Sequence, residues 1–197
     1  MWTIPNQITV FRIILIPIFL IIYYLPISWN NFGAAFVFWL ASISDALDGY
    51  LARKLKQSTA FGAFIDPVAD KLMVVCGLII ITQEYQSWLI TIPAILMIAR
   101  EVVISALREF MSSRGKRDQV AVSEMGKYKT AAQMLAIMGL IWQPDYDIPL
   151  ILFYFPYEIL MFAAYAFYAV ATVLTVWSMF TYIKAAKQEL LANNYAE

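Results

Sequence analysis

SDALDGYLARKLKQSTAFGAFIDPVADK, residues Ser44 to Lys71, contains four aspartates in a chain that is otherwise strongly apolar. Asp45 and Asp48 are three positions apart. Asp66 and Asp70 are four positions apart, so on helices the two members of each pair share one face. Four carboxylates gathered at the edge of a membrane repel one another unless some are protonated or cations lie among them. We interpret them as a site for divalent cations.

The kind of metal follows from the donor atoms. Hard carboxylate oxygens, with no His or Cys nearby, favour Mg²⁺ or Mn²⁺ over zinc. The chain contains no His, which excludes His-based acid-base and nucleophilic schemes. A purely structural salt-bridge network with Arg53 and neighbouring cations is the alternative, but four acids exceed what the nearby cations need.

Composition places the chain in a membrane. Of its 197 residues 62% are hydrophobic and 14% are charged, and its mean hydropathy is +0.68. A soluble domain carries about 25% charged residues, so the composition indicates an all-α, polytopic membrane protein. The single Cys76 argues against a disulfide framework.

The apolar pattern predicts six transmembrane helices in a single membrane domain over residues 1–197, after a short interfacial segment. The expected spans cover roughly residues 8–25 and 32–52, a third span that follows Gly62 and ends near Thr82, and then 88–110, 124–142 and 155–183. None of the 14 Lys and Arg residues falls in the turns at 26–31, 83–87 and 143–149. Because loops rich in Lys and Arg stay in the cytoplasm, we expect both termini and the aspartates on the cytoplasmic side.

Read as a pattern, the opening stretch is D-x2-D-G-x2-A-R-x8-G-x3-D-x3-D. It resembles the signature of the CDP-alcohol phosphotransferase family at every fixed position. The segments IAREVVISALREFM and SEMGKYKTAAQM extend the resemblance to bacterial members along nearly the whole chain. The resemblance implies transfer of the phosphatidyl group of CDP-diacylglycerol to glycerol 3-phosphate, giving phosphatidylglycerol phosphate and CMP. It also implies a homodimer among the lipids of the bacterial inner (cytoplasmic) membrane, with the active site facing the cytoplasm and no nucleic-acid partner.

The same resemblance assigns roles to individual residues. Asp45, Asp48 and Asp66 resemble metal ligands, and Asp70 resembles a metal-site residue that also deprotonates the acceptor hydroxyl. The expected contacts to CDP-diacylglycerol are Gly49, Ala52, Arg53, Thr59, and Asn6 and Thr9 of the segment PNQITVFR, which ends at Arg12. Two divalent ions would neutralise the diphosphate of this donor. Without the resemblance, Gly49 could equally allow close helix packing, and Arg53 could be a simple positive-inside anchor.

The acceptor is predicted from a group of cations near the cytoplasmic ends of the fourth and fifth spans, Arg100, Arg108, Lys127 and Lys129. An acceptor with its own phosphate would pair with them, whereas an uncharged alcohol would leave them without partners. Glu101 or Glu109 could instead pair with an arginine, and positive-inside topology alone could explain the lysines. Inositol phosphate, serine and phosphatidylglycerol are alternative acceptors. A metal or ion transporter is a further alternative, although its acids would normally lie near the membrane midplane.

Overall fold

The computed structural model describes residues 4–55, 60–116, 124–146, 148–149 and 154–191. Six helices make up most of this part: α1 (Ile4–Tyr24), α2 (Asn30–Leu55), α3 (Ala60–Tyr85), α4 (Trp88–Ser113), α5 (Glu124–Trp142) and α6 (Tyr157–Leu191). The prediction of an all-α fold with six helices is confirmed. Strand β1 (Ile148–Pro149) pairs antiparallel with β2 (Tyr154–Phe155) where the sequence had suggested only a turn.

The apolar pattern located the helices but underestimated their length. Helix α2 continues to Leu55 and α6 continues to Leu191, beyond the expected ends near Ala52 and Ile183. A helix satisfies its own backbone hydrogen bonds in lipid and in water alike, so it need not stop where the apolar stretch stops. The helices therefore carry the charged residues near these ends on regular structure.

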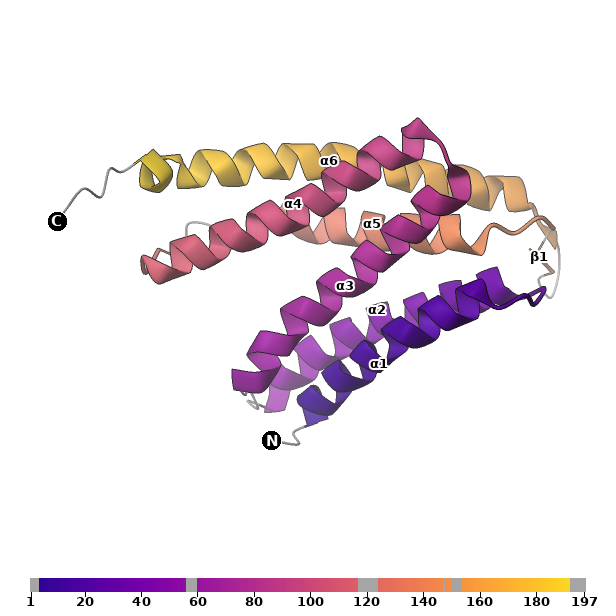
Figure 1. Cartoon of the computed structure of the whole chain (residues 1–197), viewed down its shortest axis with the longest axis horizontal. Coiled ribbons are helices and arrows are strands. Elements are labelled where there is room, and N and C mark those ends of the chain that lie inside the picture. Colours follow the sequence, from indigo (N-terminus) through magenta and orange to yellow (C-terminus); the bar gives the residue numbers. More distant parts are fainter. Residues whose placement is uncertain (1–3, 56–59, 117–123, 147, 150–153, 192–197) are drawn as a thin grey trace.

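Helices α1 and α3 run parallel to each other. Thr9 of α1 bonds Asp66 of α3, and further along both helices the Tyr23 hydroxyl donates to the Glu84 carboxylate at 2.7 Å. Residue numbers thus rise in the same direction in the two helices. Helix α2, which follows α1 in the sequence and packs on it, runs in the opposite direction and brings the chain back to where α3 begins. The loop between α1 and α2 and the β1 ribbon lie at one end of the molecule, away from the N-terminus (Figure 1).

Helices α4 and α6 are parallel as well. The hydroxyl of Tyr168 donates to the Ile90 carbonyl at 2.8 Å, and Arg108 donates to the hydroxyl of Tyr182 at 3.1 Å. Because α3 joins α4 through the two residues 86 and 87, α4 runs back toward the end where α3 begins. The carboxylates of α2 and α3 and the cations of α4 are consequently brought to the same end of the bundle.

Helix α5 packs against α2, α3 and α6 and carries much of the core. Its side chains Ile137 and Leu140 are fully buried. A Cβ atom added to Gly139 would lie 2.7 Å from the Cβ of Ala164, so α5 and α6 approach too closely there for any larger residue. Small residues at a helix crossing are typical of packing within membranes.

Three of the described helices are long and apolar enough to cross a membrane, namely α1, α4 and α6 over Asn6–Tyr24, Trp88–Ser113 and Tyr157–Lys187. Large apolar side chains of α6 point outward, with Phe162 and Phe180 more than two-thirds exposed at 75% and 71%. Such a surface suits lipid contact. Helices α2, α3 and α5 carry the aspartates and lysines of the candidate site within their length.

Candidate active site

A cavity of about 350 Å³ lies between five helices at the end of the bundle where α3 begins. Its wall includes Asp45 of α2, Asp66 and Asp70 of α3, Arg100 and Arg108 of α4, and Tyr182 of α6. The structure thus brings together three of the four predicted acids and two of the four predicted cations. Stretches far apart in the sequence form one polar chamber in an otherwise apolar molecule.

Asp45, Asp66 and Asp70 form the acidic side of the cavity, called here the acidic wall, and all three bind residues of α1. Arg12, only 1% exposed, lies between α2 and α3, with its Nη1 3.0 Å from Asp45 Oδ1 and bonded also to Asp70 Oδ1. Thr9 donates its hydroxyl to the carboxylate of Asp66. One guanidinium cannot neutralise three carboxylates, and Lys71, which also lines the cavity, reduces the negative surplus without removing it. This wall therefore remains a place for additional positive charge.

The described carboxylates do not form a closed cage of three or more ligands around one point. Arg12 accounts for part of this arrangement, because it holds Asp45 and Asp70 on its own guanidinium. The donor set is nevertheless made of carboxylate oxygens alone, which suits Mg²⁺ or Mn²⁺. The residues present therefore fit a hard divalent cation.

Several predicted residues cannot be compared with the structure. Asp48, Gly49, Ala52 and Arg53 lie on α2 and Lys127 lies on α5, but their side chains fall outside the described part, and Thr59 falls outside the described residues. Their assignments stay predictions. The two N-terminal candidates are buried in α1, Asn6 at 4% and Thr9 at 1% exposure, behind the cavity wall rather than on it.

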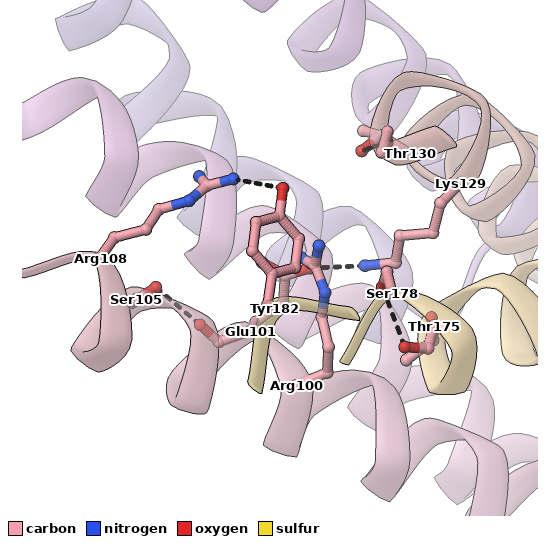
Figure 2. A network of polar contacts seen from close by, with 10 residues as sticks. Arg100, Glu101, Ser105, Arg108, Lys129, Thr130, Thr175, Ser178 and Tyr182 are labelled. Carbon is pink, nitrogen blue, oxygen red and sulfur yellow. Dashed lines mark hydrogen bonds and ion pairs between the residues drawn. The ribbon is translucent and has the colours of Figure 1, made fainter. Parts of the chain in front are cut away.

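Arg100 and Arg108, together with the neighbouring Lys129, form the basic side of the cavity, called here the basic wall. Glu101 holds this wall together. Its Oε1 accepts a hydrogen bond from Arg100 Nη1 at 2.8 Å and another from Lys129 Nζ at 2.6 Å (Figure 2). The expectation that these cations lack partners without an anionic acceptor is therefore wrong for Arg100 and Lys129, because the neighbouring carboxylate serves both. Two cations on one carboxylate still leave a positive surplus, and Arg108 adds to it. This wall can attract a phosphate group.

The cavity wall includes residues that the sequence analysis missed, among them Gln133 and Tyr182. Gln133 is 3% exposed, and its Nε2 has no hydrogen-bond partner in the described part of the structure. A signal existed for each: Gln133 follows Lys129 by four positions, and Tyr182 continues a buried polar face of α6 with Thr175 and Ser178. Both lie in long apolar stretches, where single polar or aromatic residues attract little notice.

Comparison with known proteins agrees with this chemistry. The sequence model of the family described as CDP-alcohol phosphatidyltransferase matches residues 2–183. The chain is 48% identical over 190 residues to the CDP-diacylglycerol-glycerol-3-phosphate 3-phosphatidyltransferase of Escherichia coli (strain K12), covering 96% of this chain and 98% of the relative. The protein of the same name from Shigella flexneri serotype 5b (strain 8401) is 47% identical over the same length. The chain therefore belongs to the CDP-alcohol phosphatidyltransferase family.

Proposed function

We propose that this protein transfers the phosphatidyl group of CDP-diacylglycerol to glycerol 3-phosphate, giving phosphatidylglycerol phosphate and CMP. Relatives named for this reaction match nearly the whole chain. The structural observation that carries the proposal is the pairing of an acidic and a basic wall in one cavity. A diphosphate donor needs cations held by carboxylates, and a phosphorylated acceptor needs arginine and lysine.

The acidic wall is proposed to hold two divalent ions, Mg²⁺ or Mn²⁺, on Asp45, Asp66 and Asp70, with Asp48 as the fourth ligand. When bound, these ions neutralise the diphosphate and acidify the acceptor hydroxyl. The proposal is supported by the oxygen-only donor set and by the negative surplus that Arg12 leaves. Direct donor contacts are proposed for Gly49, Ala52, Arg53 and Thr59, and Asn6 and Thr9 are proposed to support the donor site from behind the cavity wall.

Asp70 is proposed to accept the proton of the acceptor hydroxyl. The freed oxygen forms a bond to the phosphorus that bears the diacylglycerol, and the bond from this phosphorus to the CMP oxygen breaks. CMP leaves with the electron pair of that bond. Proton transfer to a carboxylate on the cavity wall requires the hydroxyl to come within hydrogen-bonding distance and to be acidic enough to release its proton, and bound divalent cations would supply that acidity.

The basic wall is proposed to bind the phosphate of glycerol 3-phosphate through Arg100, Arg108, Lys127 and Lys129. Glu101 holds Arg100 and Lys129 close together. These two long side chains are therefore already ordered before the ligand binds, which lowers the entropy cost of binding. Gln133 is proposed to donate its unpartnered amide hydrogens to an acceptor oxygen, because a buried donor without a partner is costly.

We further propose that all six helices span the bacterial inner (cytoplasmic) membrane as a single domain. Both termini and the active site would face the cytoplasm, and the chain would form a homodimer among membrane lipids. The apolar spans of α1, α4 and α6 and the alternating helix directions support this topology. Family membership removes the support for an ion transporter.

The proposal is tested with detergent-purified protein, labelled CDP-diacylglycerol and Mg²⁺. Glycerol 3-phosphate, inositol phosphate, serine and phosphatidylglycerol are offered in turn, and release of CMP is measured. We expect release with glycerol 3-phosphate alone and its loss in excess chelator. Release with a different acceptor only would overturn the acceptor while sparing the family, and undiminished release in chelator would overturn the metal site.

A further inference from the structure

Tyr182 touches both arginines of the basic wall. It lies on α6, is 5% exposed and lines the cavity. Its ring centroid is 5.4 Å from the Cζ atom of Arg108 and 5.8 Å from that of Arg100, and its hydroxyl accepts the hydrogen bond from Arg108 Nη2 at 3.1 Å. In Figure 2 the ring lies between the two guanidinium groups.

This placement addresses a physical difficulty of the site. Arg100 and Arg108 are two helical turns apart on α4, so both guanidinium groups reach the same cavity and repel each other. The electron-rich face of an aromatic ring attracts a guanidinium group, and the attraction grows when the pair is shielded from water. A buried ring can therefore hold two like charges near one another.

Among the described residues, few contacts other than those with Tyr182 fix the guanidinium of Arg108. The Nε atoms of Arg100 and Arg108 are buried and have no hydrogen-bond partner in the described part of the structure. Arg100 is additionally held by Glu101, whereas the Arg108 guanidinium donates its hydrogen bond to Tyr182. Long arginine side chains lose much rotamer freedom when they are ordered, so a fixed ring beside them lowers that cost before the ligand arrives.

We propose that Tyr182 is a positioning residue that sets Arg100 and Arg108 for a phosphate monoester. The inference rests on the proposed function, because it extends the acceptor site by a residue that acts through the arginines. Its ring sets where the guanidinium groups lie, and its hydroxyl sets the orientation of Arg108. The ligand class is a small phosphorylated alcohol.

The test compares Tyr182→Phe, which keeps the ring, with Tyr182→Leu, which removes it. We expect Tyr182→Phe to raise the KM for glycerol 3-phosphate about fivefold, less than the loss of a direct hydrogen bond to the phosphate, because the lost bond only orients Arg108. Tyr182→Leu should raise it by about tenfold or more, because the ring contacts with both arginines are lost as well. The KM for CDP-diacylglycerol and kcat should stay within about twofold, since Tyr182 acts on acceptor binding.

Tyr168→Phe is the matched control. Tyr168 is also a buried tyrosine of α6 whose hydroxyl bonds a group of α4, the Ile90 carbonyl, but it does not line the cavity. Loss of the Tyr168 hydroxyl should lower the melting temperature of the protein without changing the KM for glycerol 3-phosphate. An unchanged KM for glycerol 3-phosphate in both Tyr182 variants would overturn the inference. So would an equal rise of the KM for glycerol 3-phosphate and the KM for CDP-diacylglycerol, seen in the Tyr182 variants and in Tyr168→Phe alike. If Tyr182→Leu fails to fold, the Phe variant decides alone.

A second readout separates this inference from the proposed function. Glycerol 3-phosphate should raise the melting temperature of the wild-type protein and of Tyr168→Phe, and this rise should shrink in Tyr182→Phe. If the wild-type protein releases no CMP with glycerol 3-phosphate, the proposed function fails, while the same pattern of melting temperatures still supports the inference. No rise in the wild-type protein, or an equal rise in every variant, would overturn it.

Discussion

At the scale of single residues, Asp70 combines two tasks, an ion pair with Arg12 and the proposed acceptance of a proton. Asp70→Asn removes the basic carboxylate but leaves an oxygen that Arg12 can still bond. We expect turnover to fall by about 10²–10⁴-fold while donor binding stays measurable. CMP release and equilibrium binding of CDP-diacylglycerol check both parts.

Two further substitutions serve as a contrast and a control for Asp70→Asn. Asp48→Asn should weaken metal binding and lose both turnover and donor binding. Asp145→Asn changes an exposed carboxylate at the opposite end of the bundle and should leave activity unchanged. Wild-type turnover in Asp70→Asn would remove Asp70 from the reaction.

Gln133 provides a second prediction at this scale. Gln133→Met keeps the length and volume of the side chain but removes the buried amide donor. We expect the KM for glycerol 3-phosphate to rise by roughly tenfold, the effect of one hydrogen bond to a charged group, with the donor KM unchanged. Gln133→Glu should be worse, because a carboxylate repels the phosphate. A Met variant that binds the acceptor as well as the wild-type protein would assign Gln133 to packing alone.

At the scale of elements, the helices were predictable because a membrane leaves few alternatives to helix for an apolar chain. The ends of the helices were not predictable, since the last turns of α6 carry no apolar signal.

Convergence of Asp45 with Asp66 and Asp70 followed from their spacing. The role of Arg12 did not, because it depends on α1 lying parallel to α3, which is set by tertiary packing. Spacing also could not choose between Glu101 and Glu109, since each follows an arginine directly.

The crossing of α5 and α6 gives the prediction for an element. Gly139→Ala would place a methyl group 2.7 Å from the Ala164 Cβ, and the helices must separate to admit it. We expect a loss of about 1–3 kcal/mol of stability, measured as a lower melting temperature in detergent. Leu135→Ala is the control, because Leu135 lies on the same helix but is 45% exposed. Equal stability of Gly139→Ala and the wild-type protein would mean that the two helices are not tightly packed there.

At the scale of the whole molecule, the uneven distribution of basic residues predicts which end faces the cytoplasm. The single Cys76 allows a clean test: in a Cys76→Ser background, a cysteine replaces either Ser28, exposed in the turn between α1 and α2, or Ser113, exposed at the end of α4. A membrane-impermeant maleimide should label position 28 in spheroplasts and position 113 only after lysis. The reverse pattern would invert the topology and place the active site outside the cytoplasm.

The bridge that Arg12 makes from α1 to Asp45 of α2 and Asp70 of α3 has a consequence for how the protein matures. These helices can complete their assembly with groups of the chain itself, so a newly synthesised copy need not meet a metal ion in order to fold. Loading would then be the last and reversible stage of biogenesis. We expect a cell starved of magnesium to accumulate a dormant, folded pool that regains activity on resupply even when translation is blocked.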